Sequence, residues 1–156
     1  MPTVDQPAPA LSLLKDKSTV VDLADLRGQK VVVAFVPGAF TGVCTKEICA
    51  FRDAAGNLES LEATVLVVDV DGPFANAAWA AANSFNFPVL SDFKRNAVRA
   101  WDVAHDDFAG IAGYTAAKRS VFIVDREGVL RWQWVAPNPG VEPDYAEIQR
   151  VLGTIA

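Results

Sequence analysis

The chain has 156 residues, of which 51% are hydrophobic and 21% are charged, and its formal net charge is −5. This length and composition predict a single globular domain over residues 1–156, with a core that needs no disulfide or metal to hold it. The acidic balance disfavours nucleic acid and anionic membrane surfaces as partners.

The N-terminus has neither the basic nor the apolar segment of a secretory signal, and no apolar run is long enough to span a bilayer. We therefore expect a cytoplasmic protein that makes no use of a membrane. Because thiols are kept reduced in the cytosol, Cys44 and Cys49 are better candidates for chemistry than for a structural disulfide.

Strands and helices are predicted to alternate along the chain. Two short strands joined by a polar turn come first, and a β-branched run typical of a strand buried on both faces follows. The expected strands are 11–14, 19–23, 31–36, 64–70, 89–90, 120–124 and 129–134, and the expected helices are a segment starting at 41, then 73–85, 94–101 and 143–152. The last two strands form a hairpin with a four-residue connection, 125–128. This order indicates an α/β class, thioredoxin-like fold: a central mixed sheet flanked by helices, with an N-terminal β-hairpin.

The segment 37–49 is the most informative, because it lies where a buried strand gives way to a helix, where α/β folds place active sites. Thr41 is a natural N-cap, whose hydroxyl can accept a hydrogen bond from a first-turn amide. Cys44 then occupies the third helical position, where free N–H groups and the helix dipole favour an anion. The thiolate is the nucleophilic form of cysteine. On these residues alone, however, a buried structural cysteine is the simpler interpretation.

A helical wheel separates the two cysteines by about 140°. Cys44 shares an apolar face with Ile48, Phe51, Ala55 and Leu58, whereas Cys49 shares a polar face with Thr45, Lys46, Arg52 and Asp53. In an intact helix their Cα atoms lie about 9 Å apart, beyond the limit of roughly 7 Å for a disulfide. Either the two sulfurs never pair, or the first turns of the helix unwind, which the low helix propensity of this segment favours.

The pattern Pro37-x-x-x-Thr41-x-x-Cys44 resembles the P-x-x-x-T-x-x-C signature of the peroxiredoxins. The segments 87–92 and 119–125 are also similar to that family, and the resemblance extends over essentially the whole chain. The residues around Cys44 resemble the alkyl hydroperoxide reductase E group. The Cys44-x-x-x-x-Cys49 spacing resembles the bacterioferritin comigratory protein group, so the subfamily stays open.

The resemblance implies a thiol-specific peroxidase that reduces hydrogen peroxide and organic hydroperoxides. Cys44 would be the peroxidatic cysteine, which becomes a sulfenic acid. Thr41 would hydrogen-bond the thiolate and the peroxide, and Pro37 would shield the sulfur from water. Arg119 would stabilise the thiolate and orient the peroxide, while Glu47 would help to hold Arg119.

The resemblance further implies that Cys49 resolves the sulfenic acid as an intramolecular Cys44–Cys49 disulfide, which thioredoxin then reduces. If Cys49 is inert, a small thiol or a glutaredoxin-like protein must act instead. The family implies a homodimer or a monomer. Neither a cofactor nor a metal is expected. No Cys/His cluster has the spacing of metal ligands, and the single histidine, His105, is expected in a solvated loop.

Taken singly, these residues keep simpler interpretations: Arg119 as an exposed arginine at a strand start, Thr41 as a cap only, and Glu47 as a solvated first-turn acid.

Two other functions of the protein also stay open. A disulfide reductase is disfavoured, because it usually needs C-x-x-C in place of the spacing found here. A non-enzymatic redox sensor or holdase differs from a peroxidase in its lack of turnover.

Overall fold

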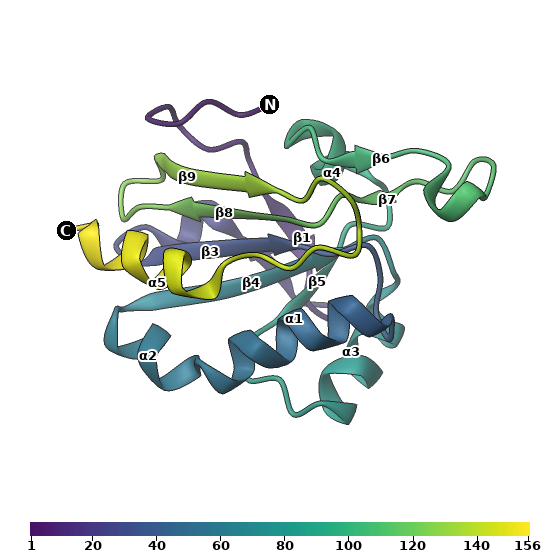
Figure 1. Cartoon of the computed structure of the whole chain (residues 1–156), viewed down its shortest axis with the longest axis horizontal. Coiled ribbons are helices and arrows are strands. Elements are labelled where there is room, and N and C mark those ends of the chain that lie inside the picture. Colours follow the sequence, from purple (N-terminus) through teal and green to yellow (C-terminus); the bar gives the residue numbers. More distant parts are fainter.

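A seven-stranded mixed sheet in the order β2-β1-β5-β4-β3-β8-β9 forms the centre of the computed structural model, which describes residues 1–156 (Figure 1). Its strands are β1 (Ser12–Leu14), β2 (Val20–Asp22), β3 (Lys30–Phe35), β4 (Ala63–Asp69), β5 (Val89–Ser91), β8 (Ser120–Val124) and β9 (Leu130–Val135). β3 pairs parallel with β4 and antiparallel with β8. A second sheet pairs β6 (Ala104–His105) with β7 (Ala116–Ala117).

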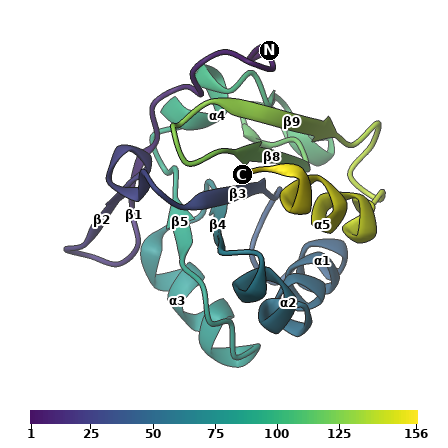
Figure 2. The same ribbon diagram turned by 90° about the vertical axis from the view of Figure 1, so that its left-hand side faces the viewer.

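Helices cover both faces of the sheet (Figure 2). They are α1 (Gly42–Asp53), α2 (Ala55–Ser60), α3 (Pro73–Ala82), α4 (Asn96–Ala100) and α5 (Tyr145–Thr154), with 3₁₀ turns at Leu23–Leu26 and Phe108–Gly110. One face packs against α1, α2, α3 and α5, and the other against α4. Side chains of β3 alternate between the two cores, which explains why its apolar run is uninterrupted. No helix is both long and apolar enough to cross a membrane.

The predicted fold class and N-terminal hairpin are confirmed, and the differences concern where elements end and one short strand pair. The helix expected from residue 41 breaks at Ala54, so Leu58 belongs to a separate α2. α3 ends at Ala82 rather than at 85, because Ser84 has a left-handed φ of 54° and Phe85 N donates to Ala80 O, closing a Schellman motif.

The hairpin prediction was one residue short. The connection between β8 and β9 spans five residues, since a register shift after Ile123 sets Val124 opposite Leu130. Val129 N instead bonds to the Asp125 side chain within the turn. The short pair β6–β7 was not predicted, because two-residue strands leave no periodic pattern in a sequence.

A buried carboxyl group closes the end of β4 against α3. Asn76 Nδ2 donates to Asp69 Oδ1 at 2.7 Å, while Asp69 Oδ2 and Asn76 Oδ1 have no partner. Burial raises the pKa of Asp69 to about 8, against the opposing effect of the Asn76 hydrogen bond. The protonated, neutral form of Asp69 suits this site, because a buried oxygen without a partner is far more costly in a carboxylate than in a neutral acid.

This carboxyl group predicts a pH-dependent stability. The folded state holds the proton more tightly than the unfolded chain, so stability falls as pH rises from about 4 to about 8, by at most about 1.4 kcal/mol per pH unit. Asp69→Asn keeps the shape of the neutral acid and does not titrate. Its free energy of unfolding relative to the wild type, measured in urea, is therefore expected to increase from about pH 5 to about pH 9. The exposed control Asp53→Asn should show no such trend, and a flat difference for Asp69→Asn would exclude the protonated form.

Candidate active site

A loop of residues 36–41 joins the carboxyl end of β3 to α1 and is held from two sides. Pro37 and Gly38 are buried, and Ala39 N donates to Asp71 Oδ2 at 2.8 Å. Phe40 is exposed and takes a left-handed φ of 61°. Such a backbone conformation is costly outside glycine, so the surrounding contacts must hold the loop in this shape.

Thr41 is the N-cap of α1 by position but not by its side chain. Its backbone is extended, and its carbonyl accepts the first helical hydrogen bond, from Thr45 N. The predicted bond from a first-turn amide to its hydroxyl is absent, and Thr41 Oγ1 instead donates to Gly38 O at 2.8 Å. The oxygen of this exposed hydroxyl therefore keeps its lone pairs available as acceptors.

Cys44 lies fully buried at the third position of α1, and its sulfur contacts the guanidinium of Arg119, which lies 75 residues further along the chain. Arg119 Nη2 donates to Cys44 Sγ at 3.1 Å. The antiparallel pairing of β3 with β8 produces this contact, since Phe35 lies opposite Ser120 and Arg119 immediately precedes β8. A cation and a helix N-terminus thus converge on one sulfur.

Glu47 completes the group one turn further along α1. Arg119 Nη1 donates to Glu47 Oε2 at 2.6 Å, and the two side chains are 2% and 0% exposed. The interpretations of Arg119 as an exposed strand-start arginine and of Glu47 as a solvated acid are therefore both wrong. Burial raises the pKa of Glu47 to about 7, although Arg119 acts to lower it. Burial also acts to lower the pKa of Arg119, but the adjacent Cys44 and Glu47 outweigh it and raise that pKa.

A connector of residues 136–144 runs from β9 to α5 (Figure 1) and contacts the guanidinium through Pro139. Arg119 Nε donates to Pro139 O at 3.0 Å, so three nitrogens of the guanidinium have three different partners. Glu142 pairs with Lys46 of α1 at 3.0 Å. The sequence indicates a turn-rich connector at 136–140 but not its contact with Arg119, because a backbone carbonyl acceptor leaves no signature in residue type.

Cys49 lies on the same helix, away from this group. Both cysteines are free, and Cys49 Sγ lies 3.7 Å from Asn83 Oδ1, just beyond the end of α3. Two further bonds join this face of α1 to the end of α3: Trp79 Nε1 to Thr45 Oγ1 at 3.1 Å, and Arg52 Nη1 to Asn83 O at 2.7 Å. The polar face of the predicted helix is therefore largely a helix–helix contact.

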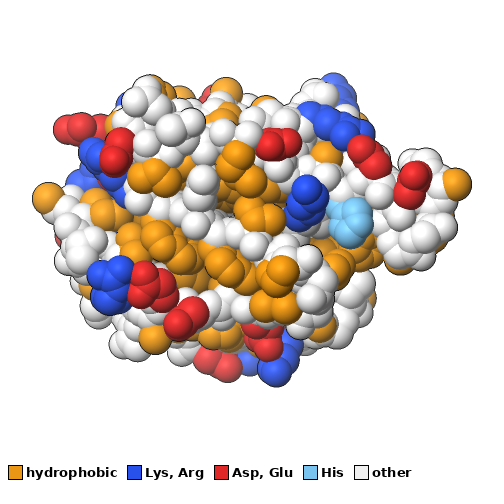
Figure 3. All heavy atoms as spheres, turned by 45° about the horizontal axis from the view of Figure 1, so that its top comes forward, with side chains coloured by type: hydrophobic (Ala, Val, Ile, Leu, Met, Phe, Trp, Pro, Cys, Tyr) orange, Lys and Arg blue, Asp and Glu red, His pale blue; other side chains and the backbone are white.

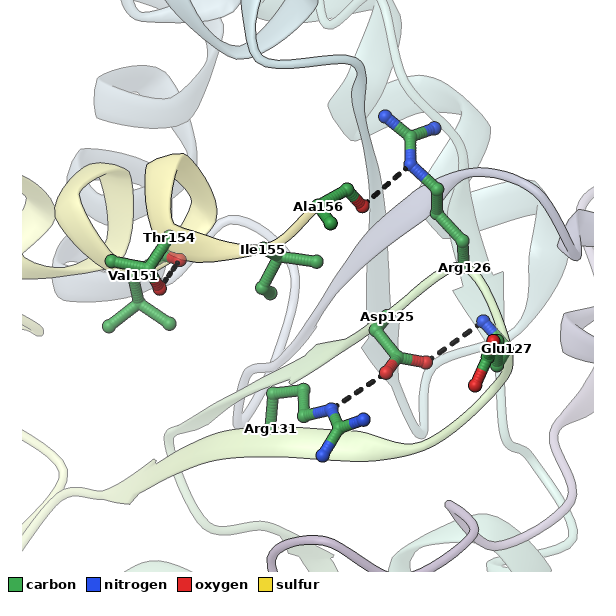
Figure 4. A pocket seen from close by; sticks show the side chains of 8 residues that line it. All are labelled: Asp125, Arg126, Glu127, Arg131, Val151, Thr154, Ile155 and Ala156. Carbon is green, nitrogen blue, oxygen red and sulfur yellow. Dashed lines mark hydrogen bonds and ion pairs between the residues drawn. The ribbon is translucent and has the colours of Figure 1, made fainter.

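One cavity borders this group of residues, and a second lies far from it. One of about 450 Å³ lies beside Arg119 and is lined by His105, Lys118 and the start of the connector. His105, the single histidine, is half-buried there and packs its ring against Phe108 (pale blue in Figure 3). A larger one of about 500 Å³ lies at the opposite end of β8, between the hairpin turn and the end of α5 (Figure 4). Its arginines are engaged by neighbouring oxygens, and no cysteine lines it.

Comparison with known proteins places the chain in one family. Residues 4–133 match the model of the AhpC/TSA family. Alkyl hydroperoxide reductase E of Mycobacterium bovis is 35% identical over 134 residues, covering 85% of this chain and 84% of that protein. A Coxiella burnetii protein named as the peroxiredoxin bcp is 32% identical over 145 residues, covering 93% and 95%. Both groups suggested by the sequence are thus represented at similar identity.

A solved structure of similar shape extends the match to the whole fold. AhpC of Mycobacterium bovis superposes with a TM-score of 0.81 at 29% identity, covering 97% of this chain and 92% of that one. The sequence, the fold and the cysteine site at the start of α1 lead to one assignment. The chain belongs to the AhpC/TSA family and is a peroxiredoxin, an oxidoreductase that reduces peroxides.

Proposed function

We propose that this peroxiredoxin reduces hydrogen peroxide and organic hydroperoxides through Cys44. The contact between Arg119 Nη2 and Cys44 Sγ carries the proposal, since a buried cation 3.1 Å from the sulfur favours the thiolate. The thiolate attacks the terminal oxygen of the peroxide. An S–O bond forms, the O–O bond breaks, and the sulfur becomes a sulfenic acid while the departing alkoxide or hydroxide takes up a proton.

Fixed hydrogen-bond donors beside the sulfur can stabilise the negative charge that develops on the leaving oxygen in this step. The guanidinium of Arg119 is held by Glu47 and Pro139 O, so it needs no reorganisation to stabilise negative charge passing from sulfur to the leaving oxygen. The hydroxyl of Thr41 already donates to Gly38 O and can accept a hydrogen bond from the peroxide O–H. Buried Pro37 helps keep water from the sulfur.

Access to the sulfur needs a small local movement. Cys44 is fully buried, so a peroxide must displace part of the 36–41 loop or of the first turn of α1 to touch Sγ. Thr41, at the junction of the two, is exposed. This arrangement suits a compact substrate, with hydrogen peroxide the smallest of its class.

Cys49 is proposed to resolve the sulfenic acid. Its thiolate attacks the sulfur of Cys44, the Cys44–Cys49 disulfide forms, and the sulfenic oxygen leaves as water after taking up a proton. Both cysteines lie within the unbroken α1, where a five-residue separation corresponds to about 9 Å between Cα atoms. The first turns of α1 must therefore unwind, which breaks the Trp79–Thr45 bond and frees Cys49 from Asn83.

Thioredoxin is the proposed reductant of that disulfide, whereas a glutaredoxin-like protein or a small thiol would reduce the sulfenic acid directly if Cys49 were inert. Two free cysteines suit a compartment that keeps thiols reduced, such as the cytoplasm. A homodimer or a monomer is the proposed state. Catalytic oxidation of NADPH in the presence of peroxide, thioredoxin and thioredoxin reductase tests the whole cycle. A single turnover without further consumption would instead indicate a sensor.

Cys49→Ser separates the two halves of the cycle. We expect it to leave the first oxidation of Cys44 unchanged and to block turnover with thioredoxin, because no disulfide can form. The fluorescence of the four tryptophans includes that of Trp79, which is hydrogen-bonded to α1. It should show an oxidation phase in both proteins and an unwinding phase in the wild type only. Mass spectrometry should find a disulfide in the wild type and a sulfenic acid in the variant. Normal turnover of Cys49→Ser with thioredoxin would rule out a resolving role.

A further inference from the structure

Two acidic side chains share a single buried guanidinium in the site. Arg119 Nη2 contacts Cys44 Sγ at 3.1 Å and Nη1 contacts Glu47 Oε2 at 2.6 Å. Cys44 and Glu47 are 0% exposed and Arg119 is 3% exposed. One positive charge can neutralise a thiolate or a carboxylate, but not both, and a net charge in a buried site is costly.

No second cation relieves Glu47. Arg119 is its only ion-pair partner, and the groups that face it from the other elements are Glu142 of the connector and Tyr145 at the start of α5. Lys46 is engaged by Glu142, which also accepts from Tyr145 Oη at 2.6 Å. Glu142 thus remains an anion and adds to the repulsion on Glu47. Glu47 Oε1 is buried without any hydrogen-bond partner, an environment that disfavours a carboxylate and so favours the protonated acid.

We propose that Glu47 holds a proton while Cys44 is a thiolate and releases it when Cys44 is oxidised, so that the site is neutral in both states. In the reduced site, the thiolate balances Arg119 and Glu47 is a neutral acid. Attack on the peroxide gives a neutral sulfenic acid and an alkoxide or hydroxide. That anion gains one proton, Glu47 loses one, and the Glu47 carboxylate then balances Arg119.

This inference rests on the proposed oxidation of Cys44 and makes Glu47 a positioning residue that acts through Arg119. It directly predicts how many protons the protein takes up from the solvent when Cys44 is oxidised. With Glu47 as the source, oxidation of Cys44 takes no proton from the solvent. Without it, each oxidation takes up about one proton from the solvent.

The count can be measured by stopped-flow mixing with hydrogen peroxide in weak buffer containing a pH indicator, in a Cys49→Ser background that stops at the sulfenic acid. At about pH 6 we expect little uptake of protons from the solvent with Glu47 present. In Glu47→Gln we expect an uptake of about one proton per oxidised sulfur. Uptake with Glu47 present should increase as pH passes about 7, the value to which burial raises the pKa of Glu47. Uptake in Glu47→Gln should stay constant. Asp69→Asn, a matched removal of a buried acid outside the site, should behave like its parent.

An infrared difference spectrum gives a second readout, which does not depend on counting protons in solution. Oxidation should remove the carbonyl band of a protonated carboxylic acid and add carboxylate bands, and Glu47→Gln should abolish both changes. Unchanged carboxylic acid bands on oxidation, or equal proton uptake with and without Glu47, would overturn the proposal. Failure of the proposed function has a different signature, since Cys44 would then show no oxidation by mass spectrometry in any variant.

Discussion

Cys44→Ser is expected to abolish peroxide consumption, lowering the rate by more than about a thousandfold. A serine hydroxyl is not ionised at neutral pH, and the guanidinium beside it cannot make it a comparable nucleophile. The fold should tolerate the change, because Arg119 Nη2 can donate to the serine oxygen as it donates to Cys44 Sγ. Peroxide consumption with thioredoxin, thioredoxin reductase and NADPH measures the effect.

The second cysteine provides the matched control for this substitution. Cys49 lies on the same helix but contacts Asn83 rather than Arg119. In a single turnover without reductant, Cys49→Ser should still consume peroxide, whereas Cys44→Ser should not. If Cys44→Ser were oxidised at Cys49 as rapidly as the wild type, the peroxidatic role would belong to Cys49 and the guanidinium contact would have no part in it.

Local sequence patterns predicted the central elements of the fold because burial dictates them. β3 and β4 are covered on both faces, so their apolar runs are unmistakable. Element ends were less predictable. The break at Ala54 depends on a single residue with near-zero ψ inside an otherwise helical segment. The β6–β7 pair depends on contacts between segments that have no apolar periodicity.

The site was predictable to the extent that a motif encodes it. Cys44 and Thr41 were found from their spacing, and the resemblance to peroxiredoxins singled out Arg119, which lies 75 residues away along the chain. That separation is bridged only by the register of β3 and β8, which no local pattern specifies. The direction of the Thr41 hydroxyl, the Pro139 carbonyl and the burial of Glu47 are consequences of packing, and only the structure reveals them.

Arg119→Met is expected to slow the oxidation of Cys44 by about 10²- to 10³-fold, comparable to the loss of a preorganised donor in other enzymes. Methionine fills similar volume but removes the charge next to the sulfur and the donor for the leaving oxygen. The fold should survive, because Glu47 can take up a proton when its partner is lost. Stopped-flow tryptophan fluorescence on mixing with hydrogen peroxide gives the rate, and a thermal melt checks the fold.

Arg119→Lys tests whether charge alone accounts for this effect. A lysine keeps the positive charge but cannot present the planar fork that reaches Cys44 Sγ, Glu47 Oε2 and Pro139 O together. Its rate should therefore lie between those of the wild type and Arg119→Met. Adding Glu47→Gln to Arg119→Met removes the unpaired buried acid, so it should improve stability at alkaline pH without restoring the rate. A wild-type rate in Arg119→Met would mean that the helix N-terminus alone sustains the reactive sulfur, and that the buried guanidinium serves only to hold Glu47 and the connector in place.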